Sequence, residues 1–140
     1  MTEPMVIVTL TLGGLLWMAG GTWWKGLRRI VLPVFYAMIA MFSGVSIHTA
    51  ILAGVVTVIV NSLPYGDLTP LPVKMLVFGS LATPAMVINL NLWPAVLASS
   101  LVLTLLFLAS QKWNQVTHKI FEGFCGFTQS SAIVVALLWR

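Results

Sequence analysis

The chain has 140 residues, of which 59% are hydrophobic and 7% are charged, and its formal net charge is +4. A soluble domain carries roughly 25% charged residues, so a soluble fold of this composition would expose most of its apolar side chains to water. No cationic stretch is long enough to form a nucleic-acid groove. The composition instead predicts an all-α, polytopic membrane bundle in which residues 1–140 form a single integral membrane domain.

The first apolar run covers about Met5 to Gly21. The residues before it, Met1-Thr2-Glu3-Pro4, lack the basic segment with which a signal peptide begins. We therefore expect this run to stay in the protein as its first membrane span. The single cysteine, Cys125, excludes an intrachain disulfide.

Residues 20–29 read GGTWWKGLRR and lie between two apolar runs. Indole rings favour the level of the lipid headgroups, and each cation near an anionic membrane surface contributes about 1 kcal/mol. The pattern predicts an anchor for cytoplasmic anionic lipids, formed by Trp23, Trp24, Lys25, Arg28 and Arg29. The alternative interpretation is a specific anion-binding site at the start of the second helix.

The second apolar stretch, residues 30–60, is too long for one span. As a single helix its 31 residues would extend about 46 Å, against a hydrocarbon core of roughly 30 Å. Its polar middle offers Gly44 as a helix stop and Ser46 as an N-cap. We expect a tight hairpin of two short helices, about Arg29 to Phe42 and Ile47 to Asn61.

Residues 62–72, SLPYGDLTPLP, have the prolines, glycine and aspartate of a loop. A fourth helix is predicted over about Val73 to Asn89, kinked or broken near Pro84. A fifth covers about Trp93 to Ser110, with Pro94 in its first turn. After an interfacial segment, QKWNQVTHK, a sixth covers about Lys119 to Trp139, which completes about six short transmembrane segments.

Charge placement predicts the orientation. If the N-terminus lies outside the cytoplasm of a bacterial inner membrane, six alternating segments place every lysine and arginine except Arg140 on the cytoplasmic side, in agreement with the positive-inside rule. The C-terminus then also lies outside. Treating residues 30–60 as one span removes this bias. A complete hairpin and a re-entrant one place the charges on the same side, so both remain open.

Polar and small side chains share one face of the sixth predicted helix, because they are spaced three, four or seven residues apart: His118, Glu122, Cys125, Gln129, Ala132 and Ala136. Glu122 falls about one turn inside the membrane boundary, where an acid indicates function. The face predicts either a water-filled polar path or a helix contact in which Glu122 pairs with His118 or Lys119, and the contact is favoured.

A second pattern on the same helix consists of small residues four apart, Gly126 with Ser130 and Thr128 with Ala132 and Ala136. Such rows are typical of close helix packing in membranes. Many of the predicted spans are short, and short spans can relieve hydrophobic mismatch by oligomerising. The sequence therefore predicts a homo-oligomer that associates through the sixth helix.

Enzyme signatures are absent from the sequence. It has neither a Gly-rich phosphate loop nor a His/Cys/Glu cluster with metal-ligand spacing, and His118 with Glu122 is the only near acid–base pair. We expect a protein that is not an enzyme and that takes no cofactor and no metal. Membrane lipids, further copies of the chain and an unidentified protein are the partners that this interpretation allows.

Two segments carry a family resemblance. GGTWWKGLRRIVLP, residues 20–33, and LPYGDLTP, residues 63–70, resemble small membrane proteins encoded by tailed bacteriophages and prophages; together they cover 22 residues. The resemblance implies a self-associating protein that forms a pore or modifies the host membrane, and it implies no site residues. Holins share the size and hydrophobicity but typically end in a charged tail, whereas this chain ends VVALLWR. The alternative is a small ion or solute channel or transporter that uses the polar face of the sixth helix.

Overall fold

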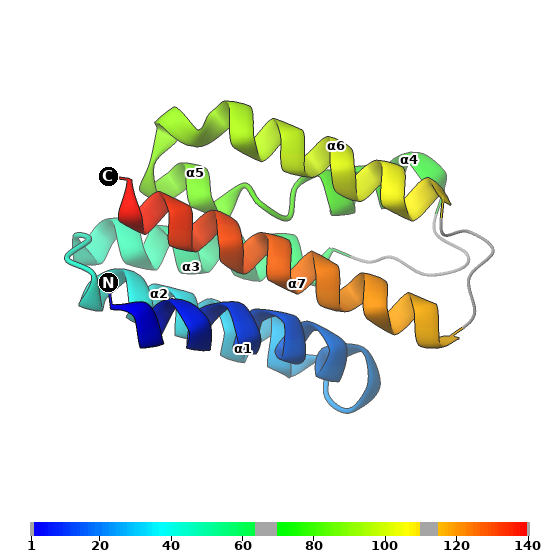
Figure 1. The fold of residues 1–140 in the computed structure, drawn as a ribbon, viewed down its shortest axis with the longest axis horizontal. Helices are drawn as coiled ribbons and strands as arrows, with labels where there is room; N and C mark the ends of the chain where they lie inside the picture. Colours follow the sequence, from blue (N-terminus) through cyan, green and yellow to red (C-terminus); the bar gives the residue numbers. More distant parts are fainter. Residues whose placement is uncertain (1, 64–69, 110–114, 140) are drawn as a thin grey trace.

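The computed structural model describes residues 2–63, 70–109 and 115–139, and throughout these ranges the regular secondary structure is helical, with no strand. The helices run back and forth along the bundle, with the two parts of a broken helix, residues 71–88, in the same direction, and the two ends of the chain lie at the same end of the bundle (Figure 1). The all-α fold expected from the composition is confirmed. By length and hydropathy four stretches can cross a membrane, Glu3–Gly20, Leu71–Ile88, Leu90–Ala109 and Lys119–Leu138, and Ile47–Ser62 forms a shorter apolar helix. These stretches indicate a multi-pass membrane protein.

The first two predicted segments form with small changes at their ends. Helix α1 covers Glu3–Thr22, with Pro4 in its first turn. The next segment begins as a π-helical turn, η1 (Leu27–Val31), and continues directly as α2 (Leu32–Phe42). The sequence did not predict the π-helical turn. Such turns are rare and are frequent at functional sites, and this one contains Arg28.

The tight turn between α2 and α3 (Ile47–Ser62) confirms the predicted stop and cap. Gly44 has φ 90°, a left-handed conformation that favours glycine. The Val45 N–H donates to the Ala40 carbonyl at 3.1 Å, and the Gly44 N–H to the Met41 carbonyl at 3.1 Å, which closes a Schellman motif. On the far side, the Ser46 hydroxyl accepts from the Thr49 N–H at 3.4 Å.

The fourth predicted helix is broken, as Pro84 indicated. Helix α4 covers Leu71–Gly79 and α5 covers Pro84–Ile88, so four residues between them leave the helical path. Two hydroxyls of the break donate to carbonyls, that of Ser80 to Val77 in the last turn of α4 at 3.0 Å and that of Thr83 to Ser80 at 2.6 Å. The break leaves backbone carbonyls that other helices can reach.

The last two helices follow a single 3-10 turn, η2 (Leu90–Leu92). Helix α6 covers Trp93–Ala109 and α7 covers Gln115–Leu138. The sequence placed residues 115–118 in an interfacial segment. That expectation is corrected, because these residues already form the first turn of α7. Most of the predicted 62–72 loop, together with Lys112 and Arg140, lies outside the described residues.

Close contacts between backbones determine how the helices pack. Helix α1 lies along α7 over most of its length, α2 packs on α3, and α4 packs on α6 (Figure 1). A Cβ atom on Gly126 of α7 would overlap the Gly13 carbonyl oxygen of α1, and one on Gly13 would overlap the Ser130 side chain. Small residues thus bring α1 and α7 together, as expected where lipid provides no hydrophobic drive for association.

Candidate functional site

The centre of the bundle contains a hydrogen-bonded node around Gln129 of α7, whose side chain is 0% exposed. Its amide oxygen accepts from Trp17 Nε1 at 3.2 Å and from Asn61 Nδ2 at 3.3 Å. Its amide nitrogen donates to Asn61 Oδ1 at 2.9 Å and to the Leu81 carbonyl, within the break between α4 and α5, at 2.8 Å. One side chain therefore joins α1, α3, α7 and the broken helix.

The N–H donors of the node are all in use. The remaining N–H of Asn61 donates to the backbone carbonyl of Arg28 at 2.8 Å, so both N–H groups of each amide bond protein acceptors. A solute could reach Gln129 only by replacing one of these bonds. At Gln129 the geometry therefore fits a helix contact and not a water-filled path.

Two charged side chains are also buried. Arg28 and Glu122 are each 6% exposed, and within the described residues they are the buried charged side chains. The Arg28 guanidinium lies over the Trp17 ring, 4.8 Å from its centroid. The Trp17 ring under the guanidinium also packs against α7 one turn from Glu122, because a Cβ atom on Gly126 would lie 2.7 Å from Trp17 Cδ1. Opposite charges thus share one region of the interior.

A glycine makes room for the buried arginine. A Cβ atom on Gly20 would lie 3.0 Å from Arg28 Cγ and 3.1 Å from Arg28 Cβ, closer than ordinary van der Waals contact. Gly20 therefore forms a notch that the arginine stem crosses on its way from η1 toward Trp17. Part of the segment GGTWWKGLRR therefore faces the interior of the bundle.

The predicted anchor residues divide between surface and interior. Trp23 is 87% exposed and Trp24 58% exposed, and Lys25 is exposed beside them. Arg29 is half-buried. Arg28 differs from these in being buried, with its guanidinium over the Trp17 ring, and contact of the five residues with lipid stays a prediction.

The predicted polar face of α7 points into the bundle. Glu122, Cys125, Gln129 and Ala136 are buried, whereas Ala132 is half-buried. The His118 side chain lies outside the described residues. Inward orientation of this face agrees with both interpretations of it, and only at Gln129 do the contacts distinguish them.

The two small-residue rows of α7 have different surroundings. Gly126 and Ser130 face α1, and the Ser130 hydroxyl lies 2.6 Å from the Tyr36 hydroxyl. These residues are therefore occupied within the chain and unavailable to a second copy. Thr128 and Ala132 instead line a groove between α6 and α7.

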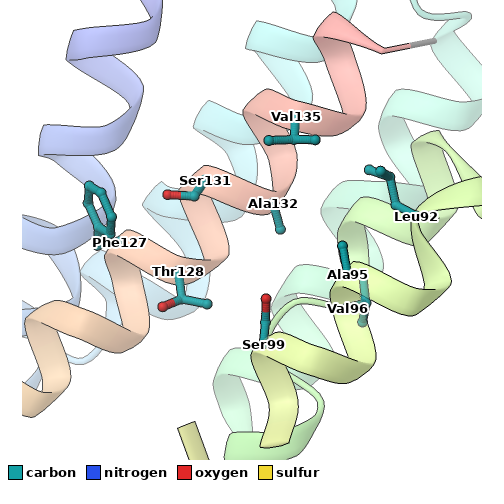
Figure 2. Close-up of a pocket in the computed structure, with 9 residues that line it drawn as sticks. All are labelled: Leu92, Ala95, Val96, Ser99, Phe127, Thr128, Ser131, Ala132 and Val135. Carbon is teal, nitrogen blue, oxygen red and sulfur yellow. The ribbon is translucent and has the colours of Figure 1, made fainter. Parts of the chain in front are cut away.

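That groove has a volume of about 270 Å³ (Figure 2). Its lining is mostly apolar or small, and comes from both helices and the turn before α6: Leu92, Ala95, Val96, Ser99, Phe127, Thr128, Ser131, Ala132 and Val135. The Ser99 hydroxyl points from α6 toward α7, whereas the Ser131 hydroxyl points away from α6 (Figure 2). The groove is the part of the α7 surface where small residues remain uncovered.

Sequence reasoning missed the partners that complete the interior: Trp17, Tyr36, Asn61 and the Leu81 carbonyl. Trp17 lies about one turn inside the first predicted span, and that depth was the available signal for an interior role. Asn61 is the last residue of a predicted apolar helix, and a polar residue at a helix end does not by itself indicate an interior role. Leu81 contributes only backbone, which side-chain patterns cannot reveal.

No group of three or more His, Cys, Asp or Glu residues with metal-binding geometry occurs in residues 2–63, 70–109 and 115–139. Comparison with protein-family models, with curated proteins and with solved structures found no match.

Proposed function

We propose that the chain is a small, non-enzymatic protein of a bacterial inner membrane that passes a small ion or polar solute through its own helix bundle. The observation that carries this proposal is the burial of Arg28 and Glu122, two opposite charges, in the region where Trp17 packs against α7. Ionisable groups within membrane segments are costly, and they mark ion pathways and relays.

The broken helix supports the same proposal. Discontinuous helices with unwound carbonyls are typical of sites near the middle of transporters. Here the break between α4 and α5 presents the Leu81 carbonyl to the interior. The saturated amide node then serves as the fixed scaffold beside the break, and the charged groups nearer the cytoplasmic end are the candidates for contact with the ion.

In the proposed orientation both ends of the chain lie outside the cytoplasm. The connection after α1 lies at the opposite end of the bundle from the termini (Figure 1). Its residues Trp23, Trp24 and Lys25 are exposed, and cytoplasmic headgroups would meet them there. The α2–α3 hairpin then returns the chain to the cytoplasmic side. The resemblance to phage membrane proteins supports a host inner membrane as the location.

The proposal is tested by flux into vesicles that contain the purified protein. Separate vesicles carry a dye quenched by thallium ions or one quenched by iodide, so that cation and anion entry are both measured. We expect Glu122→Gln to change entry of one ion about tenfold. The matched control is Glu3→Gln, because Glu3 is an exposed acid at the end of α1. Equal flux through wild type, Glu122→Gln and empty vesicles would refute the proposal for ions.

A second function, self-association that modifies the host membrane, is favoured by the open α6–α7 groove. Small residues allow close approach between helices in lipid. Thr128 and Ala132 are half-buried in the groove, so a helix of a second copy can approach them. We expect Ala132→Leu to reduce the mass of the protein in nanodiscs from an oligomer to a monomer. A wild-type protein that is already monomeric at every lipid ratio would remove this candidate.

A further inference from the structure

We infer that Glu122 binds a monovalent cation. We further infer that, in the conformation described here, the Arg28 guanidinium is the counter-ion of Glu122 and keeps the cation from binding. The inference rests on the proposed function and goes beyond it by naming the class of ion and the residue that blocks it. It depends on three features of the interior, which are the two buried charges, the single carboxylate and the notch at Gly20.

The buried charges balance each other. Taking an ion out of water is unfavourable even after the protein relaxes around it, so a buried charge requires a nearby charge of opposite sign. In the described part of the chain, Arg28 and Glu122 are the charged side chains buried to this extent, and the Trp17 ring under the guanidinium packs against α7 at Gly126, one turn from Glu122. A cation at Glu122 would therefore take over the compensation that the guanidinium now provides.

The class of ion follows from the composition of the site. Divalent cations require several oxygen ligands, usually with more than one carboxylate. Glu122 is the one buried acid among the described residues, and no group of three or more potential metal ligands occurs among them. A single negative charge in an apolar bundle is balanced by one positive charge, which a monovalent cation supplies.

The arginine has a route out of the interior. Its backbone belongs to η1, between the exposed Lys25 and the half-buried Arg29, and its stem crosses the notch at Gly20. Long cationic side chains near helix ends extend readily to the membrane interface. Stacking on Trp17, at 4.8 Å, holds the guanidinium inside, and anionic headgroups beside Lys25 would compete for it. Movement along the notch would open Glu122 to the cytoplasm.

The experiment measures thallium entry into vesicles of 3:1 phosphatidylethanolamine and phosphatidylglycerol that contain the full chain. Arg28→Gln removes the counter-ion, and we expect cation entry to rise roughly tenfold. Adding Glu122→Gln to this variant should return entry to the level of Glu122→Gln alone. Arg29→Gln is the comparison variant, since it removes the adjacent, half-buried positive charge and so reports the effect of losing one cation at this end of the bundle.

A second variant keeps every charge in place. Gly20→Val closes the notch and displaces the arginine stem, so we expect a severalfold rise in thallium entry without loss of the guanidinium. Gly20→Val still tests the counter-ion role of Arg28 if Arg28→Gln fails to fold. A melting curve of each purified variant shows whether it folds. Selective iodide entry in the wild type would overturn the assignment of a cation.

The outcomes separate the inference from the proposed function. If Glu122→Gln changes thallium entry while neither Arg28→Gln nor Gly20→Val raises it, the counter-ion role is refuted and the proposed function stands. If no variant differs from empty vesicles for either ion, both fail.

Discussion

The amide node predicts a specific loss of stability when Gln129 is replaced by methionine. Methionine has a similar volume and shape, so Gln129→Met removes hydrogen bonds without opening a cavity. Gln129 makes four of them, to Trp17, twice to Asn61 and to the Leu81 carbonyl. Interhelical hydrogen bonds in membrane proteins average about 0.6 kcal/mol each, so four bonds sum to about 2.4 kcal/mol.

The loss is measurable in two ways. Reversible unfolding in mixed micelles with increasing dodecyl sulfate reports the free energy of unfolding directly. For a chain of this size, each kcal/mol lowers the melting temperature by roughly 2–4 °C, so Gln129→Met should melt about 5–10 °C below wild type. Thr11→Val is the matched control, because the Thr11 hydroxyl is exposed on α1 and makes no hydrogen bond to any described residue.

A wild-type melting temperature for Gln129→Met would refute the reasoning. It would show that Trp17, Asn61 and Leu81 find other partners without cost, and that the node is not what ties the broken helix to α7. A large loss in Thr11→Val would refute it differently, because the effect would then not be specific to buried hydrogen bonds.

The remaining predictions concern topology, packing and the hairpin turn. A periplasmic reporter fused to the C-terminus should be active outside the cytoplasm, and activity inside would reverse the orientation. Gly126→Leu should prevent folding, because its side chain would overlap Gly13, whereas Ala132→Leu in the groove should leave the melting temperature within about 2 °C; equal losses in both would contradict the assignment of these rows. Gly44→Val should cost about 1–2 kcal/mol in unfolding experiments, because Gly44 has φ 90°, and an unchanged stability would mean that the turn relaxes.

The sequence alone determined which segments are helical and where most of them end. Apolar runs, prolines and caps act over a few residues, so Gly44, Ser46 and Pro84 could be assigned to a stop, a cap and a break before any packing was known. The α7 face was predictable for the same reason, since residues three and four apart share a side of any helix. The start of α7 was wrong because a polar segment, QKWNQVTHK, has the composition of an interface whether or not its last residues are helical.

Only the tertiary structure decided what each face meets. Gln129 bonds residues that lie 112 and 68 positions away in the chain, and no local pattern indicates which polar groups those will be. Lys25, Arg28 and Arg29 are equally cationic in the sequence. The close approach of α1 to α7, the notch at Gly20 and the ring of Trp17 place Arg28 inside while Lys25 stays exposed. The groove between α6 and α7 has the same origin, because Gly126 and Ser130 were covered by α1 and Thr128 and Ala132 were not. Hydrogen bonds within a helix are satisfied locally and follow from the sequence, whereas the burial of one side chain depends on which other helix lies against it.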